Sequence, residues 1–175
     1  MKETEAELDE LQTLLDTSLA RSTAHLRSIV TPGERTLTAR ELVRVLTGMC
    51  VLSVATVTAR GEPRISAVDG HFLHGRWVFS TTGAAAKARH LKARPAVSVA
   101  HLRGDDLGVF THGVAEFISP EHPDWAEIEE HLTRHYGSSP TTWADDVVYL
   151  RVVPHWMVAY AYQKQKVLAE AGLTS

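Results

Sequence analysis

The chain has 175 residues, 44% hydrophobic and 22% charged, with a formal net charge of −3. The length suits one domain, and the composition is that of a globular protein. The acidic balance excludes the basic surface of a general nucleic-acid binder, and no apolar run reaches the about 20 residues of a membrane span. The single cysteine, Cys50, excludes a disulfide framework and a zinc site with several thiolates. Because the N-terminus is acidic and polar rather than a secretory signal, we expect a cytoplasmic protein.

The N-terminal part of the chain is predicted to be helical. Leucines spaced three, four and seven residues apart form one stripe, made of Leu8, Leu11, Leu15, Leu19 and Leu26. This pattern predicts one amphipathic helix from about Glu3 to Ile29, which either packs on the rest of the molecule or pairs with a second copy. A shorter helix is predicted to begin at Thr38, which forms a capping box with Glu41, and to end at Gly48.

From residue 51 onward the pattern changes to the period of two that is typical of strands. The first three strands are predicted at residues 51–58, 64–71 and 76–81, and they form an antiparallel meander because only short turns join them. Later strands are predicted at 96–102, 108–118, 147–153 and 155–161, the last two on either side of Pro154. Two helices are predicted among them: a short basic helix that opens at the alanines 84–86 and ends before Pro95, and a helix over 124–136.

Strands separated by short turns and a few helices favour a closed or nearly closed barrel, so we predict a mainly β fold, a β-barrel with flanking helices. The predicted organisation is an N-terminal helix in residues 1–33, a barrel domain in 34–162, and a C-terminal tail in 163–175 with little to anchor it.

Hydroxyl side chains end the third predicted strand, just before a glycine and the basic helix. They belong to Ser80, Thr81 and Thr82, and Lys87 and Arg89 follow on the helix. Free backbone N–H groups at a helix start attract anions, and the hydroxyl and basic groups add donors and charge. These residues could therefore hold a phosphate. The same residues also fit a surface helix that Thr82 caps, which is the commoner arrangement when the segment is considered alone.

Three segments taken together resemble the pyridoxamine 5'-phosphate oxidase-like split-barrel family. They are residues 54–68, 77–82 and 87–99, and the resemblance extends over roughly 42–161, including the proline of the last strand. The N-terminal helix lies outside it. The resemblance implies a split β-barrel of the FMN-binding type, which forms homodimers and binds FMN, FAD or the deazaflavin coenzyme F-420 between the two subunits.

The resemblance also implies which residues bind the cofactor. A strand would offer backbone groups to the flavin ring at Arg64, Ile65, Ser66, Ala67 and Val68. The ribityl chain and phosphate would be contacted by Ser80, Thr81 and Thr82. Lys87 would pair with the phosphate, helped by Arg89, and Trp156 would cover the ring from the partner subunit.

A flavin carries the redox chemistry itself, so the protein needs no acid, base or nucleophile, and we predict no catalytic side chain. The resulting hypothesis is a flavin- or deazaflavin-dependent oxidoreductase that acts on a small organic substrate. A non-catalytic flavin-binding or storage protein fits the same sequence. A metal- or haem-binding protein is a further alternative, because Glu127, His131 and His135 are spaced four residues apart on one helical face; no fourth ligand is evident, and we expect no metal site.

Overall fold

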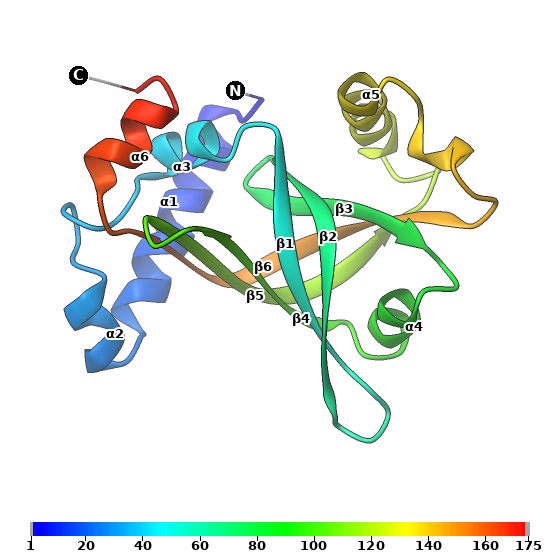
Figure 1. Ribbon diagram of the computed structural model, residues 1–175, viewed down its shortest axis with the longest axis horizontal. Coiled ribbons are helices and arrows are strands. Elements are labelled where there is room, and N and C mark those ends of the chain that lie inside the picture. Colours follow the sequence, from blue (N-terminus) through cyan, green and yellow to red (C-terminus); the bar gives the residue numbers. More distant parts are fainter. Residues whose placement is uncertain (1, 174–175) are drawn as a thin grey trace.

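A computed structural model describes residues 2–173 and shows a closed, antiparallel, six-stranded barrel with helices around it (Figure 1). Around the barrel the strands follow the order β1-β2-β3-β6-β5-β4. Their bounds are β1 (Met49–Val57), β2 (Pro63–Leu73), β3 (Arg76–Thr82), β4 (Ala96–Arg103), β5 (Leu107–Ile118) and β6 (Val147–Ala161). The predicted mainly β barrel is therefore confirmed.

Helices lie at both ends of the chain and between strands. They are α1 (Glu5–Ala20), α2 (Ala24–Ile29), α3 (Ala39–Val45), α4 (Ala86–Ala93), α5 (Trp125–Tyr136) and α6 (Lys164–Glu170), with a 3-10 turn η1 (Pro140–Thr142). In Figure 1, α1, α2, α3 and α6 gather on one side of the barrel, whereas α5 and α4 lie on the other. Within residues 2–173 no helix is long and apolar enough to cross a membrane.

One hydrophobic core fills the barrel and extends to α1. Trp77 and Phe79 of β3 are fully buried in it, and Leu8, Leu11 and Leu15 of α1 belong to the same cluster. Ser18 of α1 also accepts a hydrogen bond from the backbone N–H of Met157 in β6 at 2.9 Å. The first half of the leucine stripe thus packs against the barrel.

The prediction of one helix from Glu3 to Ile29 is wrong, because the chain breaks after Ala20. Thr23 starts α2 as its N-cap, and its hydroxyl accepts a hydrogen bond from Leu26 N at 3.2 Å. The guanidinium of Arg27 donates to the carbonyl of Ala20 at 3.2 Å, which stabilises the turn. A threonine that caps a new helix ends the old one even where the leucine spacing continues.

The prediction of two strands around Pro154 is also wrong, since β6 runs unbroken from Val147 to Ala161. The register of β5 with β6 shifts between His112 and Gly113, so that Gly113 lies opposite Pro154. A bulge tolerates a proline without an N–H, and a Cβ on Gly113 would lie 2.3 Å from the carbonyl oxygen of Val153.

The C-terminal segment is better anchored than predicted. It forms α6, whose Val167 and Leu168 are buried in the barrel core. Lys164 at its start pairs with Glu41 at 3.0 Å. The buried side chains and this ion pair hold the short helix against the barrel and α3.

Candidate functional site

The strands β2 and β3 pair only near the turn that joins them. Gly70–Leu73 pairs with Arg76–Phe79, and beyond these residues the two strands diverge (Figure 1). Residues 63–69 then pair only with β1, and 80–82 only with β6. We call these two edges, 63–69 of β2 and 80–82 of β3, the split. Neither edge has a strand partner on its other side within the described chain, so their N–H and C=O groups can bind a ligand.

Lys87 meets a hydroxyl group at the end of β3. Its ammonium Nζ lies 3.3 Å from Thr81 Oγ1, and both side chains are half-buried. The position of α4 follows from its buried residues Ala88 and Leu91, and from His90, whose Nδ1 lies 3.0 Å from Thr56 Oγ1 on β1. The structure therefore places these two residues of the predicted phosphate site within hydrogen-bond distance of each other.

The three predicted hydroxyls do not share one face. Phe79 packs in the barrel core and Val78 packs beneath α5. Because side chains alternate along a strand, Thr81 lies on the face of Phe79, whereas Ser80 and Thr82 lie on the other face. The side chain of Arg89 is exposed to solvent on α4.

The predicted residues of β2 are likewise divided between two faces. Val68 belongs to the barrel core, so Ser66 and Arg64 are on its face and Ile65 and Ala67 are on the opposite one. Ile65 is 75% exposed. The tip of the β1–β2 hairpin projects beyond the barrel (Figure 1), and the guanidinium of Arg64, the second residue of β2, pairs with Glu62 at 2.9 Å. Only the backbone of this segment therefore faces the split along its whole length.

An acidic residue that sequence reasoning missed lies at the start of α4. The backbone N–H of Ala84 donates to Asp146 Oδ2 at 2.8 Å, and that of Gly83 donates to the Asp146 carbonyl at 2.7 Å. The pairing of Thr82 with Val147 brings these residues together, and it was the only signal that could have revealed the contact. One amide that could bind an anion is thereby occupied.

The first turn of α4 still offers donors to an anion. Ala85, the N-cap, makes no capping bond through its side chain, and the N–H groups of residues 86–88 have no backbone acceptor in the described structure. Together with Lys87 and Thr81, they can bind a phosphate group. These residues and the free strand edges fit a cofactor with a planar ring and a phosphate-bearing tail.

Trp156 lies far from the split of its own subunit. Residues 80–82 pair with 147–149 of β6, and Trp156 is seven residues further along that strand, roughly 23 Å at about 3.3 Å per residue. Its indole stacks on the ring of His112 on the outer face of the barrel, with the ring centres 4.6 Å apart. Trp156 could reach a cofactor in the split only from a second copy of the chain.

The histidines of α5 do not converge with Glu127. The carboxylate of Glu127 lies 3.0 Å from His74 Nε2, whereas His131 Nε2 lies 3.0 Å from His71 Nδ1. Burial lowers the pKa of His71 to about 3 and that of His131 to about 4, so both imidazoles are neutral. In residues 2–173 no group of three or more His, Cys, Asp or Glu side chains could hold a metal ion. The structure gives no support to the metal alternative.

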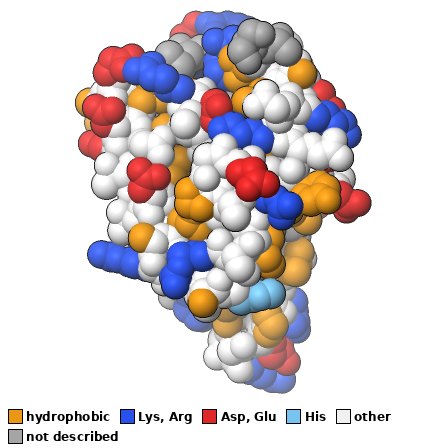
Figure 2. Space-filling view, turned by 90° about the vertical axis from the view of Figure 1, so that its left-hand side faces the viewer, with side chains coloured by type: hydrophobic (Ala, Val, Ile, Leu, Met, Phe, Trp, Pro, Cys, Tyr) orange, Lys and Arg blue, Asp and Glu red, His pale blue; other side chains and the backbone are white. Residues whose placement is uncertain are grey.

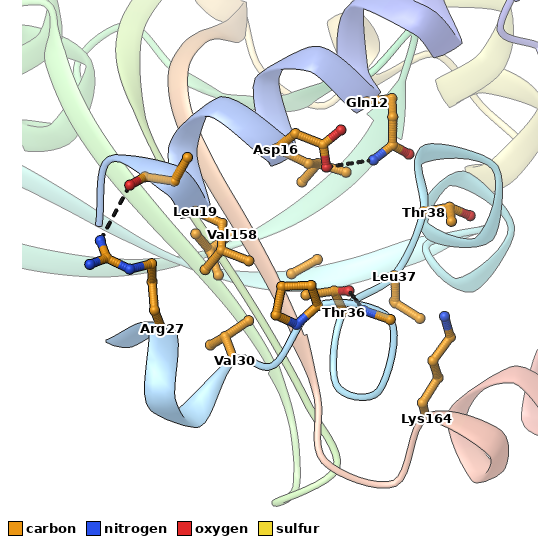
Figure 3. Close-up of a pocket in the computed structure, with 15 residues that line it drawn as sticks. Gln12, Asp16, Leu19, Arg27, Val30, Thr36, Leu37, Thr38, Val158 and Lys164 are labelled. Carbon is orange, nitrogen blue, oxygen red and sulfur yellow. Dashed lines mark hydrogen bonds between the residues drawn. The ribbon is translucent and has the colours of Figure 1, made fainter. Parts of the chain in front are cut away.

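A cavity of about 380 Å³ lies between α1, α2, the following loop and β6 (Figure 3). Apolar side chains cover its floor, among them Leu19, Val30 and Val158, and Arg27 and Lys164 lie at opposite ends. Its polar groups are already paired: Gln12 with Asp16 at 2.9 Å, and Lys164 with Glu41 at 3.0 Å. The cavity shares no residue with the split, and none of these paired groups is free to bind a ligand.

Comparisons with known proteins agree with this architecture. A family model described as "Pyridoxamine 5'-phosphate oxidase" matches residues 38–159. A conserved hypothetical protein from Mycobacterium tuberculosis is similar in structure at 21% identity and a TM-score of 0.63, over 75% of this chain and 89% of that chain. The heme storage protein HutZ from Vibrio cholerae is similar at 17% identity and a TM-score of 0.59, over 69% and 93%. A structure described as an F-420 reductase is similar at 25% identity and a TM-score of 0.52, over 65% and 92%. Among curated proteins no match was found.

Proposed function

Because the chain belongs to the pyridoxamine 5'-phosphate oxidase family, whose model covers residues 38–159, we propose that it is a flavin- or deazaflavin-dependent oxidoreductase acting on a small organic substrate. The observation that carries the proposal is the contact of the Lys87 ammonium with the Thr81 hydroxyl, 3.3 Å apart, at the end of the split. An ammonium, a hydroxyl and free amides at one place match a phosphate, and an unpaired strand edge matches the polar rim of a planar ring.

The phosphate of the cofactor would bind Lys87, Thr81 and the first amides of α4, with Arg89 adding positive charge nearby. The ribityl chain would lie along Ser80 and Thr82. The ring would lie along the backbone edge of β2, over a segment made of Arg64, Ile65, Ser66, Ala67 and Val68. The bound cofactor supplies the hydride chemistry, and the chain contributes binding and orientation. FMN, FAD and coenzyme F-420 all carry a phosphate on their ribityl chain, so these contacts suit each of the three cofactors.

The proposal includes a homodimer. Four exposed apolar side chains lie on three adjacent strands, β1, β4 and β5: Met49, Val51, Leu102 and Val114. Monomeric proteins rarely leave such a group of side chains in water. A second copy packed on this face would cover it and could bring Trp156 of the partner subunit to the split.

The test begins with the absorption spectrum of the purified protein and a titration of the apoprotein with FMN, FAD and coenzyme F-420. We expect saturable binding of at least one of the three. A Soret band with no flavin binding would overturn the proposal in favour of haem. Turnover then separates an enzyme from a storage protein: reduced, bound cofactor should be reoxidised by a small organic acceptor faster than free cofactor. If bound and free cofactor were reoxidised at equal rates by every acceptor, the protein would be a cofactor carrier, and the proposed enzyme activity would be refuted.

A further inference from the structure

A second pocket lies on the outer face of the barrel, where α2 packs beside β5 and β6. Its volume is about 330 Å³. Helix α2 and the residue after it contribute Leu26, Ile29 and Val30, and the strands contribute Phe110, His112, Trp156, Val158 and Tyr160. It lies on the helical side of the molecule, where Figure 2 shows hydrophobic side chains at the surface between scattered charged ones. The family model begins at residue 38, so the α2 wall belongs to the part of the chain outside it.

Two stacked rings line this pocket, so each ring offers a ligand its edge and the face that the other ring does not cover. His112 and Trp156 are cross-strand partners, and their rings stack with centres 4.6 Å apart and planes 20° apart. Ser98 on β4 holds the imidazole in this orientation, because its Oγ lies 2.8 Å from His112 Nδ1. No hydrogen bond from a described residue reaches Nε2 of His112, so this nitrogen can bind a ligand.

The lining selects against charged ligands. Among the described residues that line it, His112 is the only titratable side chain apart from the Tyr160 phenol. Burial lowers the pKa of His112, and the nearby His155 lowers it further, so the imidazole is neutral at pH 7. A charged group would lose its hydration here and gain no partner. A planar ring, in contrast, gains contact with Trp156 and His112.

We propose that this pocket binds the substrate, and that the substrate is an uncharged, planar ring compound with one hydrogen-bonding group for His112 Nε2. The assignment as substrate rests on the proposed function, in which Trp156 covers the cofactor ring in the split of the partner subunit. A ring bound against the edge of Trp156 would then lie beside the cofactor. The volume is at the lower end of the about 300–1,000 Å³ of small-molecule pockets, which suits a molecule of two fused rings.

The experiment titrates the apoprotein with 2-naphthol, and with decahydro-2-naphthol as the non-planar control, by isothermal titration calorimetry. We expect 2-naphthol to bind once per chain and its saturated analogue to bind at least tenfold more weakly. Trp156→Leu should weaken 2-naphthol at least tenfold. Trp143→Leu, which removes an exposed tryptophan outside the pocket, should have no effect. Equal affinity for the two compounds would overturn the proposal, and so would an affinity for 2-naphthol that Trp156→Leu leaves unchanged.

The role of His112 is tested with naphthalene, which lacks the hydroxyl group. His112→Phe keeps a ring in the stack, so it should weaken 2-naphthol about fivefold and leave naphthalene unchanged. An equal loss for both compounds would show that His112 only shapes the pocket and makes no hydrogen bond to the ligand. If a second copy fills the pocket, the dimer will bind neither compound, and the proposal fails.

The same preparations separate this inference from the proposed function. In protein loaded with flavin or deazaflavin, we expect 2-naphthol to shift the visible absorption bands of the cofactor, because the two rings lie close together. Cofactor binding with no binding of 2-naphthol would refute the pocket alone. Binding of 2-naphthol at Trp156 in a protein that binds no cofactor would refute the proposed function, and with it the assignment of the ligand as a substrate.

Discussion

Among the described residues, Lys87 is the cation that directly contacts a hydroxyl of the split, so its replacement tests the phosphate site. Lys87→Ala removes a charge-assisted hydrogen bond, worth about 1.5–3 kcal/mol. We expect the affinity for a phosphate-bearing flavin or deazaflavin to fall about tenfold to hundredfold in an apoprotein titration. Lys92→Ala, on the exposed side of α4, is the matched control and should change little. Unchanged affinity of the Lys87 variant for all three cofactors would remove this residue from the site.

Asp146 is expected to weaken phosphate binding, because its negative carboxylate lies at the start of α4, which would face the phosphate. It accepts a hydrogen bond from Ala84 N at 2.8 Å. Asp146→Asn keeps an acceptor for that bond but removes the negative charge. We expect phosphate-bearing cofactors to bind about two- to fivefold more tightly, in line with about 0.5–1 kcal/mol for an exposed charge. The gain should shrink as salt is added, since salt screens exposed charges.

The exposed neighbour Asp145 supplies the control for this change. Asp145→Asn alters the net charge equally, yet Asp145 makes no hydrogen bond to the start of α4 among the described contacts. A similar gain from both variants would mean that overall charge, rather than the position of Asp146, controls cofactor binding.

Among the elements, the turn between β2 and β3 is joined to two helices through His74. Its Nδ1 lies 2.9 Å from Glu7 on α1 and its Nε2 lies 3.0 Å from Glu127 on α5. Burial alone would lower the pKa of His74, but the hydrogen bonds and charges of Glu127 and Glu7 outweigh it and raise the pKa above its ordinary value. The imidazolium thus holds the two helices to the barrel.

The pH dependence of stability follows from this raised pKa. The stabilisation is complete below the unfolded pKa of about 6.5 and disappears as the pH rises through the folded pKa. Relative to wild type, His74→Asn should lower the free energy of unfolding by about 0.5–1 kcal/mol at pH 6 and by much less at pH 9. Asparagine suits the positive φ of 52° at this position.

Urea unfolding at several pH values measures this difference. His25→Asn is the control, because His25 is exposed on α2 and makes no ion pair in the described structure. A difference in the free energy of unfolding between wild type and His74→Asn that stayed constant from pH 6 to 9 would show that the charge of the imidazolium does not hold the helices.

Local signals predicted most elements, and one of the two main errors, the division at Pro154, came from contact with a partner strand. Thr38 and Glu41 form the predicted capping box, with bonds of 3.2 and 2.7 Å, because a cap needs only residues close in sequence. Pro154 was misread as a strand end because the bulge that accommodates it involves Gly113 on another strand. In the site, Thr81 and Lys87 are six residues apart and could be predicted together, whereas Asp146 meets Ala84 only through the register of β3 with β6.

The molecule as a whole leaves one apolar face in water, and this face carries the last prediction. Leu102 on β4 is 60% exposed and lies among the other apolar side chains of β1 and β5. If a second copy covers this face, Leu102→Glu would bury a charge without a partner in the interface. We expect the variant to be monomeric by light scattering, while the wild-type chain is a dimer.

Cofactor binding should weaken together with the dimer, because a monomer has no partner to bring Trp156 to the split. Trp143→Glu is the control: Trp143 is 51% exposed but lies beyond η1, away from this face. A monomeric Leu102 variant that binds flavin as tightly as the wild type would show that one subunit holds the whole site. In that case Lys87 and the first turn of α4 would account for the affinity, and the pocket beside Trp156 would have no cofactor near it.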